Sequence, residues 1–309
     1  MDRDKLSKFQ QIEDLHESQT SYFSAPNTDL DPNLFFGNRI KPWVRNNISR
    51  LLFDHLGVRY SAPNKWVRIW LAGSGVSYQW SAERDPGDLD CLVGIDYVEF
   101  RKANYEYAGF SDQEIASMFN EGFNADLMPN TKNWNGYELT YYVNARSDIK
   151  DLNPYAAYDL TNDTWTVEPD RSAHAPYSRS WEQQSQRDYD TASELVARYS
   201  SALSDIKTAP NDAYRLNAER RLKLSVEQAV SFYDDIHNGR KAAFSVSGSG
   251  YSDFNNYRWQ AGKKTGAVPA LRAIKQYQDE VKKQEQLDTY GVELPDTRTL
   301  IRRAAQKNP

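Results

Sequence analysis

Two aspartates separated by one residue stand at the start of an apolar run, in the order Asp88-Leu89-Asp90 followed by residues 91–93. In a β-strand, successive side chains alternate between the two faces, so Asp88 and Asp90 project from the same face about 7 Å apart. Two like charges at this spacing are costly unless a counter-charge neutralises them. A hard divalent cation such as Mg²⁺ takes oxygen ligands of this kind and often shares its ligand shell with substrate phosphates. The two aspartates therefore predict a cation site beside a phosphate-bearing substrate.

A glycine-serine pair precedes the aspartates. Gly73 and Ser74 follow an apolar run at residues 67–72, and residues 75–87 separate the pair from Asp88. A glycine lets the backbone approach a phosphate closely, and a serine hydroxyl can donate a hydrogen bond to a phosphate oxygen, above all if a helix follows the turn. In isolation the pair is more typical of a plain β-turn. In front of the aspartates it predicts a phosphate-binding turn.

A third acid lies further along the chain. Residues 137–143 form a strongly β-prone run, with Glu138 near its start. If this run lies beside the strand of the aspartates and Glu138 faces the same side, the three carboxylates form a cradle for two metal ions. Other metal sites are improbable, because the chain has one cysteine, Cys91, and four scattered histidines. A single cysteine also excludes an internal disulfide, and we expect Cys91 to be a small buried strand residue.

This ordered set resembles the nucleotidyltransferase superfamily typified by DNA polymerase β, which also contains CCA-adding enzymes and poly(A) polymerases. In that family a hydrophobic-Gly-Ser motif, here residues 72–74, is followed after a gap by Asp-hydrophobic-Asp, here residues 88–90, and then by a third acid. The gap, residues 75–87, is at the long end for the family, and Glu138 stands where aspartate is commoner. The resemblance covers roughly residues 40–167 and does not reach the C-terminal half. The tyrosine and tryptophan content and the atypical C-terminal half also resemble nucleotidyltransferases encoded by bacteriophages.

The resemblance implies an enzyme that moves a nucleoside monophosphate from an NTP, with ATP or CTP expected, to an acceptor hydroxyl and releases pyrophosphate. Asp88 and Asp90 would hold two Mg²⁺ ions, with Mn²⁺ as an alternative, and Glu138 would act as a third metal ligand or as the base. The transition state gains charge on the phosphate oxygens, which glycine-serine backbone groups and lysines can stabilise. The expected nucleotide-binding residues are Gly73, Ser74, Lys263 and Lys264.

The expected acceptor is the 3′ end of an RNA, such as a tRNA. In residues 257–264, aromatic residues are interleaved with Lys and Arg, an arrangement that could stack a base while neutralising phosphates. A surface loop tethered by its aromatic side chains is a simpler interpretation of the same stretch. Three alternatives to RNA stay open: transfer onto a protein or a small molecule, synthesis of a signalling oligonucleotide, and a catalytically silent nucleotide- or RNA-binding member of the fold.

Composition narrows the class of protein. The 309 residues carry a net charge of −5, which argues against wholesale coating of nucleic acid, although residues 240–309 contain thirteen Lys and Arg against seven Asp and Glu. The chain has no run of eighteen apolar residues, and its N-terminus lacks the apolar segment of a signal peptide. We therefore expect a soluble, cytoplasmic protein that does not enter a membrane.

The expected fold class is α+β, with a polymerase β-like mixed-sheet domain followed by an all-helical domain. We divide the chain into an N-terminal arm at residues 1–38, a catalytic domain at residues 39–180 and a helical domain at residues 181–309. The arm is polar, with one short helix expected at residues 5–17 and little core of its own.

Hydrophobic periodicity predicts the elements of the two domains. In the catalytic domain we expect strands at residues 67–72, 137–143 and 164–167, a helix at 39–56, and a second helix that starts with a capping box of Ser111 and Glu114. In the helical domain, apolar residues repeat at helical spacing over 189–206, 222–236 and 268–285. Pro210 should end the first of these helices, and Asn238-Gly239 the second.

Overall fold

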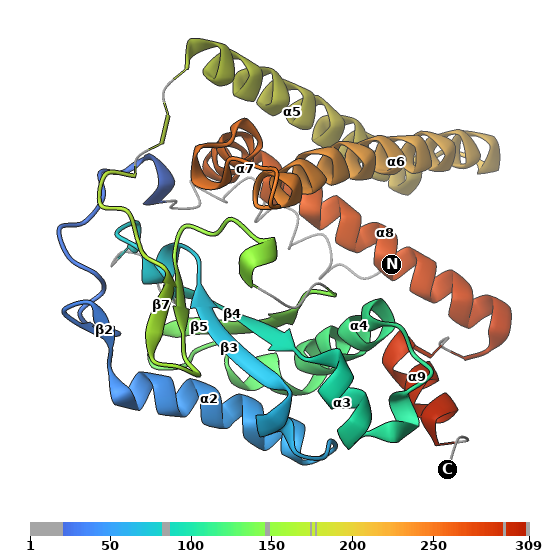
Figure 1. Cartoon of the computed structure of the whole chain (residues 1–309). Coiled ribbons are helices and arrows are strands. Elements are labelled where there is room, and N and C mark those ends of the chain that lie inside the picture. Colours follow the sequence, from blue (N-terminus) through green and yellow to red (C-terminus); the bar gives the residue numbers. More distant parts are fainter. Residues whose placement is uncertain are drawn as a thin grey trace. The chain divides into compact units, whose positions relative to one another are not determined.

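The computed structural model describes residues 21–81, 87–145, 149–173, 175–176, 178–292 and 295–306. Within these ranges the chain divides into two compact units (Figure 1). Residues 21–173 and 295–306 form a unit built around a β-sheet, here called the sheet unit. Residues 175–292 form a unit of helices, here called the helical unit. The α+β class, with a mixed sheet and a helical C-terminal region, is therefore confirmed at this level.

The sheet unit contains a five-stranded mixed sheet with the strand order β5-β4-β3-β6-β7. The central pair β3 and β4 is antiparallel, β5 runs parallel to β4, and β6 and β7 continue antiparallel on the other side of β3. The strands are β3 (Val67–Ala72), β4 (Gly87–Ile95), β5 (Tyr137–Val143), β6 (Ala157–Asp159) and β7 (Thr164–Val167). Three of the expected strands thus form over the residues that their patterns predicted.

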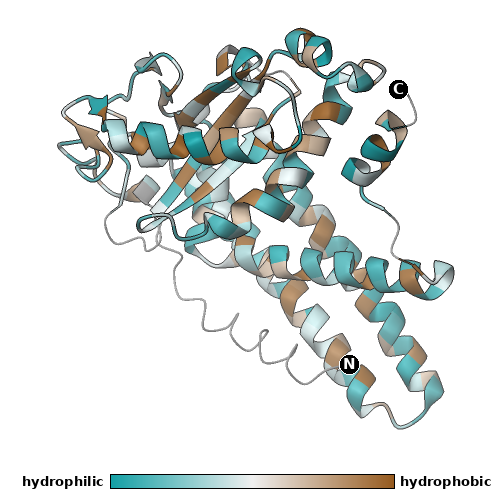
Figure 2. Cartoon of the chain, turned by 90° about the horizontal axis from the view of Figure 1, so that it is seen from below, coloured by the Kyte–Doolittle hydropathy of each residue, from teal (hydrophilic) through white to brown (hydrophobic). Residues whose placement is uncertain are grey.

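One face of this sheet carries the main hydrophobic core. The helices α2 (Pro42–Gly57), α3 (Tyr97–Ala103) and α4 (Asp112–Gly122) lie along it (Figure 1). Alternate strand residues such as Leu89 and Cys91 are fully buried against these helices. The residues between them, including the two aspartates, must therefore project from the opposite face. Figure 2 shows the strands as mainly hydrophobic, whereas the long helices carry hydrophobic and hydrophilic residues in turn.

The helices of the sheet unit begin where local chemistry predicts. Helix α2 starts at Pro42, which lacks an N–H and is tolerated in the first turn. Its buried stripe is Val44, Ile48, Leu52 and Leu56. Helix α4 starts with the expected capping box: the Ser111 side chain accepts a hydrogen bond from the backbone N–H of Glu114, and the Glu114 carboxylate accepts one from the backbone N–H of Ser111 at 2.8 Å. The capping box is confirmed, and the expected helix at residues 39–56 forms as α2, except that Arg39–Ile40 belong to strand β2 and the helix starts at Pro42.

Residues 21–38 belong to the core of the sheet unit. They include the short strand β1 (Phe35–Phe36), which forms a hairpin with β2 (Arg39–Ile40). Leu30, Leu34 and Phe35 are buried in the main core. Although this stretch is mainly polar, these three apolar residues pack it against the core. The helix expected at residues 5–17 lies outside the described residues.

The helical unit consists of α5 (Arg179–Thr208), α6 (Asp212–Ala243), α7 (Phe254–Lys264) and α8 (Ala267–Tyr290). Its core contains Tyr199, Trp259 and Leu271 among other buried side chains. Helix α5 ends at Thr208, two residues before Pro210, as expected.

Helix α6 does not stop at Asn238-Gly239, where the sequence predicts its end. It continues to Ala243, because a glycine inside a helix costs only about 1 kcal/mol. The absence of a side chain is needed here: a Cβ on Gly239 would lie 2.9 Å from the side-chain oxygen of Asn255 in α7. Gly239 is therefore a point of close helix contact rather than a helix end.

The chain returns to the sheet unit after the helical unit. Helix α9 (Thr297–Ala305) packs on α4 and buries Ile301 and Ala305 in the main core. The guanidinium of Arg298 forms an ion pair with Asp126 at 2.7 Å. The sequence-based division instead placed all of residues 181–309 in one helical domain. A nine-residue helix gives no sign in its sequence of which unit it packs against.

No helix in the described ranges has both the length and the apolar character needed to cross a membrane.

Candidate functional site

The strand register places the three acidic residues on one face of the sheet. Asp88 pairs with Glu138 across the parallel strands β4 and β5, and Asp90 pairs with Thr140 two positions further on. Residues paired in this way on neighbouring strands project from the same face, with the strands about 4.8 Å apart. Asp88 and Asp90 are half-buried, whereas Glu138 is exposed. The geometry expected of a third acid on a neighbouring strand is therefore present.

The glycine-serine turn lies directly against the aspartates. Gly73 leaves β3 with φ +92°, a conformation that residues with a side chain rarely adopt, and a Cβ there would lie 3.3 Å from Oδ2 of Asp90. A Cβ on Gly75 would lie only 2.5 Å from the carbonyl oxygen of Asp88. The two glycines thus allow the turn to approach β4 at both aspartates. The structure thus places the turn at Gly73 against Asp88 and Asp90, and the strand register places Glu138 beside Asp88.

The turn is short, and no α-helix follows it. Residues Ser74–Val76 form a single 3₁₀ turn, which closes when the backbone N–H and the hydroxyl of Ser77 both donate to the carbonyl oxygen of Ser74, at 3.1 and 3.0 Å. Any phosphate contact at this turn would therefore rely on local N–H groups and the Ser74 hydroxyl, without the dipole of a long helix.

Thr140 is a residue of this face that the sequence-based reasoning did not single out. Its hydroxyl donates a hydrogen bond of 2.8 Å to Oδ1 of Asp90, so it fixes the orientation of that carboxylate. The signal was available in the sequence, because Thr140 is two positions after Glu138 and must share its face if residues 137–143 form a strand.

Cys91 lies on the opposite face from its two neighbours Asp90 and Leu92. It is fully buried in the main core, as expected for a small strand residue. Burial raises the pKa of the Cys91 thiol well above its ordinary value, and the charge of Asp90 adds to this effect. The thiol is therefore protonated at neutral pH and unsuited to act as a nucleophile.

The three carboxylates are not arranged as a preformed metal-coordination site. In the part of the chain that the structure describes, no three His, Cys, Asp or Glu side chains are grouped so that they could hold a metal ion. The donors themselves fit Mg²⁺, because carboxylate oxygens on adjacent register positions share one face and Oδ2 of Asp90 is directed at the turn. A rotation of the exposed Glu138 side chain would be needed for it to join the aspartates on one ion.

Lys263 and Lys264 are in the last turn of α7, within the helical unit. The aromatic residues before them do not form a stacking surface. Tyr257 and Trp259 are 9% and 3% exposed, and the guanidinium of Arg258 is paired with Asp188 at 2.6 Å. The expected base-stacking role of residues 257–264 is therefore wrong for these two rings, because helical spacing turns them into the interior.

Comparison of the chain with protein-family models, with curated proteins and with solved structures gives no match. The chemistry of the site must therefore be argued from its own residues.

Proposed function

We propose that this protein is a metal-dependent nucleotidyltransferase of the DNA polymerase β type. It transfers a nucleoside monophosphate from an NTP to an acceptor hydroxyl and releases pyrophosphate. One observation carries the proposal: the Gly73 turn packs against Asp90, while the strand register sets Asp88 beside Glu138 on the same face. A phosphate-binding turn and three carboxylates on one face are the parts that this chemistry requires.

The order of the elements supports the same proposal. Helix α2 precedes β3, the turn follows β3 directly, and the antiparallel strand β4 brings the aspartates back to that turn. The parallel strand β5 then adds Glu138. This succession of a helix, a turn-bearing strand, an aspartate strand and a third acidic strand agrees with the resemblance noted in the sequence.

Each residue receives a role from its position. Asp88 and Asp90 would hold Mg²⁺, with Glu138 as a third ligand or as the base that accepts the proton of the acceptor hydroxyl. The ions, when bound, would neutralise phosphate charge and lower the pKa of the attacking hydroxyl. Ser74 would donate its hydroxyl to a phosphate oxygen, and Thr140 would hold the Asp90 carboxylate in one orientation.

We propose an RNA 3′ end as the acceptor. The support is the excess of Lys and Arg over Asp and Glu in residues 240–309, because phosphate contacts made by basic side chains supply most non-specific affinity for nucleic acid. Lys263 and Lys264 are proposed to contact phosphates of the nucleotide or the RNA. Tyr257 and Trp259 have no part in this role, since they are buried.

The decisive experiment is incubation with labelled NTPs, Mg²⁺ and total RNA, followed by a denaturing gel. Label in RNA is expected. Label on protein or in a small soluble product would replace RNA by another acceptor while keeping the transfer chemistry. Absence of both label transfer and pyrophosphate release would contradict the enzyme assignment.

A second candidate is a nucleotide-binding member of the fold without transfer activity. Glu138 is exposed, and no three His, Cys, Asp or Glu side chains in the described ranges are grouped to hold a metal ion, which favours this candidate. Equilibrium binding of an NTP without pyrophosphate release in the presence of Mg²⁺ or Mn²⁺ would select this candidate.

A further inference from the structure

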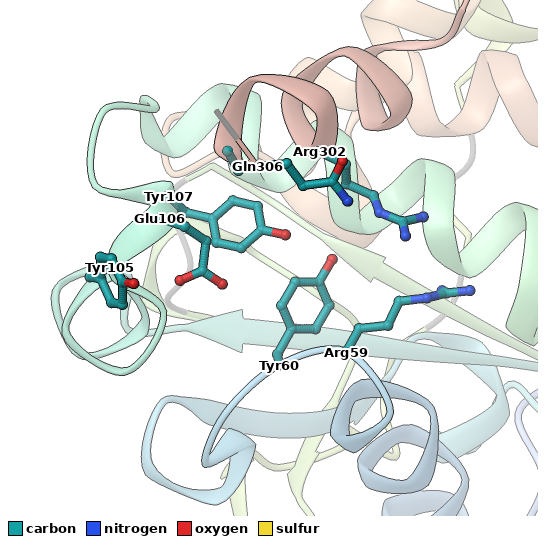
Figure 3. A pocket seen from close by; sticks show the side chains of 8 residues that line it. Arg59, Tyr60, Tyr105, Glu106, Tyr107, Arg302 and Gln306 are labelled. Carbon is teal, nitrogen blue, oxygen red and sulfur yellow. The ribbon is translucent and has the colours of Figure 1, made fainter. Parts of the chain in front are cut away.

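A cavity of about 490 Å³ opens in the sheet unit, away from the three carboxylates (Figure 3). It is an open depression bordered by the residues after α2, by the 3₁₀ turn η4 (Tyr105–Tyr107) and by α9. Its lining residues Tyr107 and Ala305 belong to the core under α2, α3 and α4, which is the face opposite to Asp88 and Asp90. The cavity is therefore separate from the proposed active site. Its size is in the range of sites for small organic ligands.

The two ends of the cavity carry opposite charges. Figure 3 shows the guanidinium of Arg302 at one end and the carboxylate of Glu106 at the other. Both line the cavity, and neither forms an ion pair with any residue in the described ranges. Charged side chains that line a cavity without a protein partner are suited to bind a ligand of opposite charge.

Two arginines, Arg59 and Arg302, line the same end of the cavity (Figure 3). Arg59 lines the cavity and pairs with Asp126 at 2.7 Å. The same carboxylate also pairs with Arg298 at 2.7 Å. The Asp126 carboxylate is therefore shared by Arg59 and Arg298, and the backbone N–H of Arg298 also donates to the carboxylate of Glu121. An acidic ligand group would give the guanidinium of Arg302 a partner of opposite charge.

Two tyrosines form the wall between the charged ends. The rings of Tyr60 and Tyr107 are 5.9 Å apart, and their hydroxyl groups point toward the Arg302 end (Figure 3). Burial raises the pKa of both hydroxyls, so both are protonated and can donate hydrogen bonds. The hydroxyl of Tyr60 donates to Sδ of Met118 at 3.8 Å, and a thioether sulfur is a weak acceptor. Apolar ring faces with hydroxyl donors at one end match an organic body that ends in an acid.

We propose that this cavity binds a small dipolar molecule, with an acidic group at Arg302 and Arg59, an amino group at Glu106, and an apolar or planar body against Tyr60 and Tyr107. Amino acids, which carry a carboxylate, and aminated nucleoside monophosphates, which carry a phosphate, share this chemistry. Because Arg302 belongs to α9 and Gln306 caps its C-terminal end, the ligand bridges α9 to the turns around it. Binding therefore holds α9 on the sheet unit.

Two pairs of probes test the proposal on the full-length protein by calorimetry. Cytidine 5′-monophosphate has an uncharged amino donor at C4 of the base where uridine 5′-monophosphate has a carbonyl, and L-phenylalanine has a charged α-ammonium group that 3-phenylpropionate lacks. The aminated member of at least one pair is expected to bind with a Kd below about 1 mM and at least about fivefold more tightly than its partner. Preference within the nucleotide pair identifies a phosphate ligand, and preference within the second pair a carboxylate ligand.

Single substitutions test which end of the cavity binds the acidic group of the ligand and which end binds its amino group. Arg302→Gln should raise the Kd of the preferred probe by about tenfold or more, since the substitution removes a charge-assisted hydrogen bond. Glu106→Gln should abolish the preference for the amino group while leaving the deaminated probe unchanged. The matched control is Arg303→Gln, the neighbouring exposed arginine of α9 that does not line the cavity.

The proposal fails if none of the four probes binds in this range, or if Arg302→Gln and Arg303→Gln weaken binding equally. Equal loss would indicate general attraction of anions to a basic helix. Glu106→Gln keeps the test informative if Arg302→Gln does not fold. Transfer activity of the wild-type protein is not part of the measurement, so failure here is distinct from failure of the proposed enzyme function.

Discussion

At the scale of single residues, the candidate active site depends on two glycines and one threonine. Gly73 and Gly75 let the turn touch β4, and Thr140 holds one oxygen of Asp90. None of the three would carry out the chemistry itself. Each of them fixes the position of a proposed phosphate-binding or metal-binding group. Substitutions at these three positions should therefore reduce activity more than substitutions at exposed positions away from the site.

Gly75→Ala should damage both stability and nucleotide binding. The added methyl would meet the carbonyl oxygen of Asp88 at 2.5 Å and a methyl of Leu89 at 2.8 Å, so the backbone must shift. We expect a loss of about 1–3 kcal/mol in the free energy of unfolding and a weaker affinity for NTP. The control is Gly109→Ala, where no atom lies within 4 Å. Equal denaturation midpoints for the two variants would contradict the packing of the turn.

Thr140→Val should lower transfer activity by about tenfold to a hundredfold, because residues that orient metal-binding carboxylates have effects of this size. The valine keeps the shape of threonine and removes the hydroxyl that donates to Asp90. Thr140→Ser restores the hydroxyl and should recover most of the activity. Steady-state rates at several Mg²⁺ concentrations would check this, with a raised Mg²⁺ requirement expected for the valine variant. Activity unchanged by the valine would remove Thr140 from the site.

At the scale of elements, the sequence predicts the strands well and the helical unit less well. Strands β3, β5 and β7 cover the residues that their β-prone patterns mark, and the capping box locates the start of α4. These signals are local, and the local preference agrees with the fold. By contrast, the pairing of Asp88 with Glu138 depends on strand register, which no local pattern encodes.

The two helix errors have physical causes. Helix α6 passes through Gly239 because α7 packs closely there. The sequence of α7 indicates a basic-aromatic surface stretch, because Arg258, Lys263 and Lys264 alternate with residues of a buried face. Trp259, on that face, is 3% exposed. In both cases tertiary contacts outweigh local propensity.

The docking of α9 should depend on Asp126, which pairs with Arg59 and Arg298. Burial alone would raise the pKa of Asp126, but hydrogen bonds from the two arginines outweigh it and hold the pKa below its ordinary value of 3.8. A depressed pKa in the folded state stabilises the fold above the ordinary value. This stabilisation should be lost as the pH falls through the lowered pKa.

Asp126→Asn should accelerate hydrogen exchange in α9 and lower the free energy of unfolding by about 1 kcal/mol at pH 7. The pH dependence of stability between pH 5 and pH 2 should become shallower than in the wild type, by about the contribution of one carboxylate. Asp54→Asn, at an exposed position on α2, is the control. Exchange in α9 that is equal in the two variants would contradict the role of this ion pair.

At the scale of the whole molecule, the chain builds a sheet unit, continues into a helical unit, and returns to the first with α9. The α+β class could be predicted because strand patterns fill one half of the sequence and helical periodicity the other. The return could not be predicted, since Ile301 and Ala305 are an ordinary apolar pair of a short helix. The proposed enzyme needs the sheet unit for its acids and its turn.

The most direct test of the central claim is pyrophosphate release from NTP in the presence of Mg²⁺ and total RNA, measured for the wild type and for Asp88→Asn and Asp90→Asn. Both substitutions keep the side-chain size and remove a proposed metal-binding charge. We expect each to reduce the rate by more than about a hundredfold, with little change in melting temperature, while Asp54→Asn retains the wild-type rate. Wild-type rates in either aspartate variant would contradict the assignment of this face of the sheet as the active site.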